Sequence, residues 1–212
     1  MPRAPGDWQK TVRSAKAQIR KSEARKAIAT LLPALRWRYD TARNEAIALL
    51  ASVGRPAEPD LLRTLRFAET AVERRSAADA LGLMRSRRAV PLLLASLADP
   101  NMVVRRSASV ALLRVRAREA VPRIARLLED ESGGVRVLAA SVLGEFGERS
   151  AVPGLVHALR DEKWYVRQIA ARALGALRDP RSIGPLRRAA RDPRRAVAEA
   201  AAEALAKCDV DM

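Results

Sequence analysis

The sequence predicts an all-α protein in which two-helix repeats stack into a solenoid. The same residue types recur at a step of 31 positions along the 212-residue chain, which is typical of a repeat array. The apolar residues are mainly Ala, Leu and Val, only 3% of the chain is aromatic, and no run of alternating β-branched residues predicts a strand. The step is kept by Asp99, Asp130, Asp161 and Asp192, by Val104, Val135, Val166 and Val197, and by Leu81, Leu112, Leu143, Leu174 and Leu205.

The N-terminal part of the chain predicts one basic amphipathic helix over residues 9–32, ended by Pro33. Val12, Ala15 and Ile19 have the spacing of a buried helix face. We therefore expect residues 1–39 to form a basic N-terminal helix and cap. Residues 40–212 are expected to form the repeat array, with about five repeats and a terminal half-repeat. The basic face of the N-terminal helix includes Lys10, Arg13, Lys16, Arg20 and Lys21.

Each repeat is expected to contain a first helix, for example residues 103–115, and a second helix, for example residues 120–129. Proline falls in the first turn of the second helix, where the missing N–H costs least. Near the end of the first helix, glycine predicts a close approach between neighbouring backbones. The prolines are Pro91, Pro122 and Pro153, and the glycines are Gly82, Gly144 and Gly175.

An arginine near the start of each first helix also keeps the 31-residue step, as Arg74, Arg105, Arg136 and Arg167. An aspartate precedes the first helix by a few residues, where it can cap the helix. We expect each arginine to reach the aspartate between repeats and to form a ladder of ion pairs such as Asp130–Arg136 and Asp161–Arg167, whose paired hydrogen bonds would fix the stacking angle. These arginines are therefore assigned to structure rather than to ligand binding.

Two segments carry a family resemblance: DESGGVRVLAASVLGEFGERSAVPGL at 130–155 and DEKWYVRQIAARALGALRDPRSIGPL at 161–186. They resemble the HEAT-like repeats of phycobilisome lyases, called PBS-lyase HEAT repeats, and the resemblance covers residues 40–207. It implies a right-handed α-solenoid of stacked HEAT-like repeats whose second helices line the concave face. The motif is specific for the fold and says little about activity.

The chain shows no constellation typical of catalysis. It has one histidine, His157, and one cysteine, Cys208, and it lacks metal-ligand spacings and a phosphate-binding loop. We expect no catalytic residue, no metal site and no cofactor, and hence a protein that is not an enzyme. The resemblance leaves two enzymes as lesser alternatives, a lyase for bilin attachment and a DNA glycosylase of the HEAT-like type.

The net charge of +16 favours an acidic partner, and half of it lies in residues 1–39. Arginines also gather at the exposed positions expected for the later second helices. Trp164 and Tyr165, expected in a turn between repeats, are added as candidates because the repeat does not demand aromatic residues there. The equivalent pairs in neighbouring repeats are Gly133-Gly134, also expected in a turn, and Met102-Val103. The predicted partner-binding residues are Arg123, Arg126, His157, Arg160, Trp164, Tyr165, Arg187, Arg188 and Arg191.

These observations predict a non-catalytic scaffold or adaptor that binds a protein partner with an acidic surface. The alternative is sequence-independent nucleic-acid binding through Lys10, Arg13, Lys16, Arg20 and Lys21. The terminal helix, residues 196–207, has no second helix to cover it, so self-association through it is also possible. A lone cysteine and the absence of an apolar leader or a membrane-spanning run predict a cytoplasmic protein.

Overall fold

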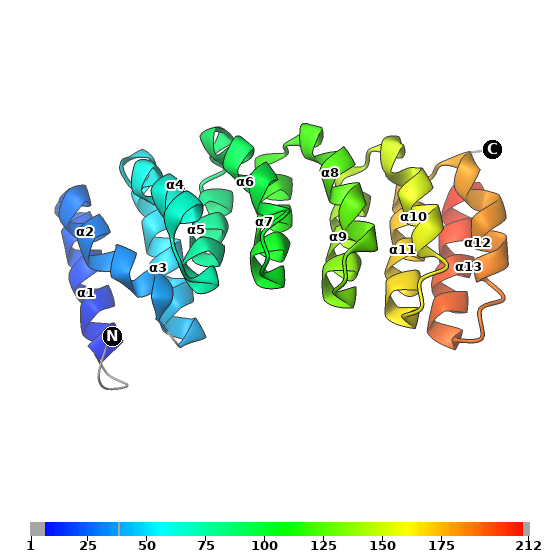
Figure 1. Cartoon of the computed structure of the whole chain (residues 1–212), viewed down its shortest axis with the longest axis horizontal. Coiled ribbons are helices and arrows are strands. Elements are labelled where there is room, and N and C mark those ends of the chain that lie inside the picture. The colour runs from blue at the N-terminus through cyan, green and yellow to red at the C-terminus, as the bar shows by residue number, and fades with distance from the viewer. Residues whose placement is uncertain (1–6, 38, 210–212) are drawn as a thin grey trace. The chain divides into compact units, whose positions relative to one another are not determined.

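A computed structural model of the chain describes residues 7–37 and 39–209. Their regular structure consists of α-helices and short 3-10 turns, with no β-strand in either range (Figure 1). The predicted all-α class is confirmed. None of the helices in these two ranges is long and apolar enough to cross a membrane.

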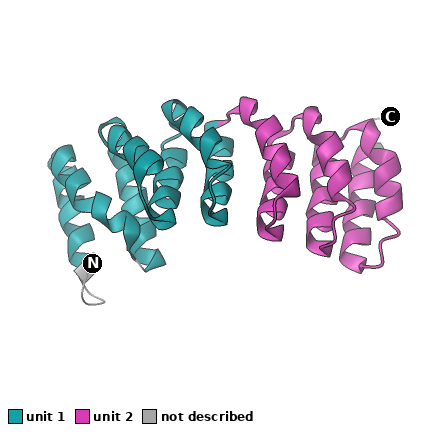
Figure 2. Ribbon diagram, viewed as in Figure 1, with its two compact units in different colours: residues 1–115 teal, residues 116–212 magenta. Residues whose placement is uncertain are grey.

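The chain divides into two compact units, residues 1–115 (unit 1) and residues 116–212 (unit 2), which Figure 2 shows in different colours. Both units are built from helices that pack side by side. The helices of unit 1 are α1 (Asp7–Arg20), α2 (Ala24–Leu31), α3 (Asp40–Val53), α4 (Glu58–Phe67), α5 (Ala71–Leu83), α6 (Val90–Ser96) and α7 (Met102–Val115). Those of unit 2 are α8 (Val121–Arg126), α9 (Gly133–Phe146), α10 (Val152–Ala158), α11 (Trp164–Leu177), α12 (Ile183–Ala189) and α13 (Arg195–Asp209).

The repeats of both units alternate a long first helix with a short second helix. In unit 2 the first helices α9, α11 and α13 pack in sequence, and α10 and α12 each pack on the first helix that follows. A 3-10 turn leads into each second helix, and a proline lies in the first turn of α8 and of α10. The 31-residue step places Leu143 and Leu174 at fully buried positions of α9 and α11, so the periodic leucines form the seam between repeats.

Glycine permits the close stacking of the first helices, as the sequence predicts. A Cβ atom on Gly175 of α11 would lie 2.7 Å from the Cβ of Ala204 in α13. In unit 1, a Cβ on Gly82 of α5 would lie 2.8 Å from the Cα of Ala111 in α7. Both distances are shorter than van der Waals contact, so a larger residue would push the helices apart.

The prediction of one helix over residues 9–32 is wrong. The chain forms α1 and α2 instead, and Ser22 between them has a φ of 60°, in the left-handed region. The break lets the chain turn back so that both helices bury apolar residues, including Val12 of α1 and Ile28 of α2. The two helices pack on α3 within unit 1. The boundary at residues 39 and 40 stays a prediction, and residues 1–6 and 38 of the predicted cap lie outside the described residues.

Two residue pairs assigned to turns between repeats are instead helical. Trp164 and Tyr165 begin α11, and Gly133 and Gly134 begin α9. Both helices begin at these pairs because the turn between the repeats ends just before them. The Asp161 carboxylate accepts a hydrogen bond from the backbone N–H two residues later, at 2.8 Å, so the chain enters the helix at the next residue.

Candidate partner-binding surface

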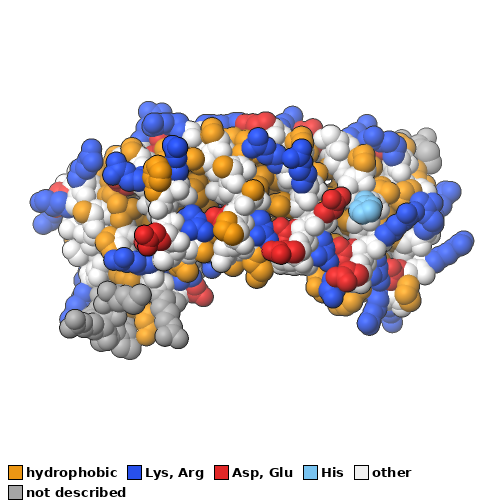
Figure 3. Space-filling view, in the orientation of Figure 1, with side chains coloured by type: hydrophobic (Ala, Val, Ile, Leu, Met, Phe, Trp, Pro, Cys, Tyr) orange, Lys and Arg blue, Asp and Glu red, His pale blue; other side chains and the backbone are white. Residues whose placement is uncertain are grey.

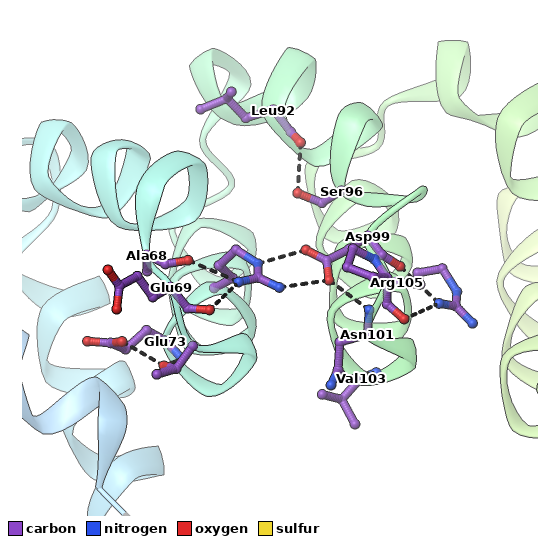
Figure 4. A network of polar contacts seen from close by, with 12 residues as sticks. Ala68, Glu69, Glu73, Leu92, Ser96, Asp99, Asn101, Val103 and Arg105 are labelled. Atoms are coloured by element: carbon purple, nitrogen blue, oxygen red, sulfur yellow. Dashed lines mark hydrogen bonds and ion pairs between the residues drawn. The ribbon is translucent and has the colours of Figure 1, made fainter.

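The periodic arginines and aspartates form a ladder of ion pairs between successive repeats. In unit 2, Arg136 donates to Asp161 through Nε at 2.7 Å and Nη2 at 2.9 Å. In unit 1, Arg74 donates in the same way to Asp99 at 2.7 and 3.0 Å, and Figure 4 shows Asp99 at the centre of this network. Arg74 and Arg136 therefore bind the aspartate of the following repeat, and the predicted pairing of Arg136 with Asp130 is wrong.

The arginine does contact the aspartate of its own repeat, but through the backbone. Arg136 Nη1 donates to the carbonyl oxygen of Asp130 at 2.9 Å, while its Nε and Nη2 extend forward to the next repeat. One guanidinium thus joins two turns. Arg167 and Asp192 repeat this pairing, and their hydrogen bond lowers the pKa of Asp192. The ladder arginines are occupied, so they are not available to a partner.

A second set of polar contacts, which the sequence analysis missed, lies at the turns between the first and second helix of a repeat. Asp179 in unit 2 is 3% exposed and accepts hydrogen bonds from the Arg181 side chain at 2.7 and 2.9 Å. In unit 1 the buried Glu58 accepts from Ser86 and pairs with Arg88 at 3.1 Å. Glu58 begins α4, whereas Val90 begins α6, and this departure from an apolar residue is the sequence signal that could have identified the contact.

Six arginines at the second helices of unit 2 have no such partner. All are exposed, and none makes a side-chain hydrogen bond or an ion pair within the residues that the structure describes. The single histidine, pale blue in Figure 3, is also exposed, with basic side chains nearby on the same face. We call the six residues the second-helix arginines: Arg123, Arg126, Arg160, Arg187, Arg188 and Arg191.

The structure brings two of the second-helix arginines together in one groove. Arg160 follows α10 and Arg188 lies on α12, and both line a groove of about 190 Å³. Its apolar lining includes Val156, Leu159 and Pro185. Asp192 also lines it, but Arg167 holds that carboxylate. The groove therefore offers two unpaired guanidinium groups beside an apolar surface, which suits a carboxylate carried by a peptide.

Trp164 and Tyr165 do not line this groove. Their rings meet edge to face with centroids 5.8 Å apart, and they are 39% and 37% exposed. A Cβ on Gly133 would lie 2.8 Å from the Tyr165 hydroxyl oxygen, so Tyr165 covers the start of α9 in the preceding repeat. Tyr165 thus has a packing role, and a role of either aromatic in partner binding stays a prediction.

The predicted basic residues of the N-terminal helix are exposed on and just after α1. Lys16 pairs with Glu45 at 2.6 Å, whereas Lys10, Arg13, Arg20 and Lys21 make no ion pair within the described part of the chain. Cys208 is buried. Within residues 7–37 and 39–209, no three His, Cys, Asp or Glu side chains are placed to hold a metal ion.

Comparison with known proteins places this architecture in a family. The family model for HEAT repeats matches residues 28–114, 59–136 and 120–206. A search of curated proteins finds no match.

Similar solved structures include YibA of Escherichia coli, at 19% identity and a TM-score of 0.63, covering 90% of this chain and 74% of that one. The CpcE–CpcF complex of phycocyanin lyase from Nostoc sp. PCC7120 has 19% identity and a TM-score of 0.51, covering 100% of this chain and 91% of that one. A designed armadillo repeat protein in complex with the peptide (KR)4 has 16% identity and a TM-score of 0.58, covering 84% and 98%. Likeness at this level of identity shows the fold alone, whereas the family-model matches extend from residue 28 to residue 206. The chain belongs to the HEAT-repeat family.

Proposed function

We propose that the protein is a non-catalytic scaffold that binds an acidic segment of a protein partner through the second-helix arginines. The observation that carries this proposal is the difference between two classes of arginine. The ladder arginines Arg136 and Arg167 are each bound to a carboxylate, whereas the second-helix arginines have none within the described residues. Unpaired guanidinium groups on neighbouring elements attract carboxylates and can bind them with two hydrogen bonds.

The groove between α10 and α12 gives the proposal its geometry. Arg160 and Arg188 would hold a carboxylate, while the adjacent apolar side chains would contact the methylene groups of a glutamate or aspartate. The designed armadillo relative is described as a complex with a basic peptide. The surface proposed here is positively charged, as that peptide is, so the peptide that matches it is acidic.

Charge reversal tests the proposal. The probe is a fluorescein-labelled peptide of alternating Glu and Ser, and its affinity is measured by fluorescence anisotropy at low and at physiological salt. We expect the triple variant Arg187→Glu, Arg188→Glu, Arg191→Glu to bind it about 10- to 100-fold more weakly than wild type. The matched control, Arg13→Glu, Arg20→Glu, Lys21→Glu, changes the net charge equally and should bind almost as wild type does. Equal weakening in both variants would show that net charge alone binds the peptide.

Nucleic-acid binding by α1 is a second candidate function. Lys10, Arg13 and Arg20 are exposed without an ion pair in the described part of the chain, and they share one side of the helix. Such a face would contact phosphates without reading sequence. Binding to duplex DNA whose affinity falls steeply with salt, and which the Arg13, Arg20 and Lys21 variant abolishes, would support this function. No binding to duplex DNA at physiological salt would remove it.

A further inference from the structure

Unit 1 has an apolar groove of about 810 Å³ between α4 and α6. Its lining includes Phe67, Pro91, Leu92 and Ala95. Phe67 is 68% exposed, although a phenylalanine side chain gains most from burial. An exposed aromatic ring beside further apolar side chains marks an interaction surface rather than a packed core.

The repeat does not require apolar residues at these positions. At the 31-residue step, Phe67 corresponds to Arg160, and Leu92 and Ala95 correspond to Arg123 and Arg126. The unit 2 positions hold exposed arginines in the same fold, so stacking tolerates charge there. Stacking does not require the apolar character of the unit 1 groove.

The groove also has a cationic rim. The Arg66 guanidinium carbon lies 5.0 Å from the centre of the Phe67 ring, over its face. Arg63, one turn earlier in α4, is also exposed but does not line the groove. Neither arginine makes an ion pair within the described residues. The carboxylate that lines the groove, Asp99, is bound by Arg74 and does not neutralise the rim.

We propose that this groove binds a bulky apolar side chain of a partner protein where that side chain is flanked by Glu or Asp. The apolar side chain would lie against Phe67, Leu92 and Ala95, and the flanking carboxylate would pair with Arg66. Burial of apolar surface supplies the attraction, and the charged rim selects acidic neighbours. The site lies in unit 1 and does not depend on the second-helix arginines.

The test uses the full chain carrying Arg187→Glu, Arg188→Glu and Arg191→Glu, which reverses half of the second-helix arginines and so reduces the contribution of the surface of the proposed function. The probe is a fluorescein-labelled peptide with Leu and Phe between pairs of Glu, measured by anisotropy. Adding Ala95→Glu, which fills and charges the groove at an exposed position, should weaken binding about tenfold. The matched control is Leu83→Glu, at a 45% exposed apolar position outside the groove, and it should leave the affinity unchanged.

The peptide itself supplies the second readout. Replacing its Leu and Phe with Ser should weaken binding about tenfold, and replacing its Glu with Lys should abolish it. Equal binding of the Ser peptide would overturn the apolar part of the proposal, and equal binding of the Lys peptide would overturn the charge part. Ala95→Glu and Leu83→Glu proteins of equal affinity would place the binding elsewhere. Arg123, Arg126 and Arg160 are the same in the Ala95→Glu and Leu83→Glu proteins, so a difference between these two proteins reports on the groove and not on the second-helix arginines.

Discussion

Arg43 occupies the ladder position of the first repeat but has no aspartate in the next repeat. Arg74, Arg136 and Arg167 each reach a carboxylate 25 residues ahead, and from Arg43 that position is Ala68. Arg43 is 5% exposed; it donates to the Trp37 carbonyl oxygen at 2.6 Å and pairs with Asp40. Its buried Nε has no hydrogen-bond partner, and burial lowers the pKa of its guanidinium.

We expect Ala68→Asp to stabilise the protein by about 1–2 kcal/mol, because it supplies the missing carboxylate. The backbone is already suitable: Ala68 has φ −66° and ψ 134°, close to the −61° and 144° of Asp130. The free energy of unfolding, from urea titration followed by circular dichroism, measures the gain. Ala68→Asn is the matched control, and an equal gain from Asn would argue against a restored ion pair.

Asp179 gives a pH-dependent prediction. The side-chain hydrogen bond from Arg181 is the largest cause that lowers the pKa of Asp179 from 3.8 to about 2. Because the folded pKa lies below the unfolded one, the stabilisation is complete above about pH 4 and is lost as the pH falls toward 2. Asp179→Asn should therefore lower the free energy of unfolding by about 2 kcal/mol at neutral pH, and by much less near pH 2. Urea titrations at several pH values measure the difference, and a constant difference would contradict the assignment.

At the scale of the helices, much of the fold could be predicted. The step of Val, Ala and Leu places the first helix of the clear repeats, because the seam between repeats buries the same positions each time. The break between α1 and α2 could not be predicted, since no Gly or Pro marks Ser22, whose φ is 60°. The sequence also could not show which aspartate each ladder arginine pairs with. Arg136 is 6 residues from Asp130 and 25 from Asp161, and only the stacked helices show which carboxylate it meets.

The contact between first helices gives a prediction about helix packing. Gly175→Ala should lower the free energy of unfolding by about 1–2 kcal/mol, because the new methyl group collides with Ala204 and outweighs the helix preference of alanine. Gly184→Ala in α12 is the matched control. The atom nearest to a Cβ there is Arg188 Nη1, at 4.0 Å, so this change should cost nothing. Similar effects of the two substitutions would contradict the role given to the close approach.

At the scale of the whole molecule, the arginines fall into two groups. Some arginines hold repeats together, and others are left exposed on the second helices. The sequence alone identified the exposed set, because the 31-residue step separates positions that the repeat uses from positions that vary. It did not identify the groove that Arg160 and Arg188 share, since that requires the packing of α10 and α12. The cationic contact over Phe67 was missed for the same reason.

The division between paired ladder arginines and exposed second-helix arginines is tested most directly by arginine modification with phenylglyoxal. The modified residues are mapped by mass spectrometry with and without the acidic Glu-Ser peptide. In the free protein, Arg187, Arg188 and Arg191 should be modified, while Arg136 and Arg167 should stay largely unmodified because their guanidinium groups are paired and partly buried. The peptide should protect the first three and leave the exposed Arg172 of α11 reactive. Equal protection of Arg172, or no protection of the second-helix arginines, would contradict the proposed function.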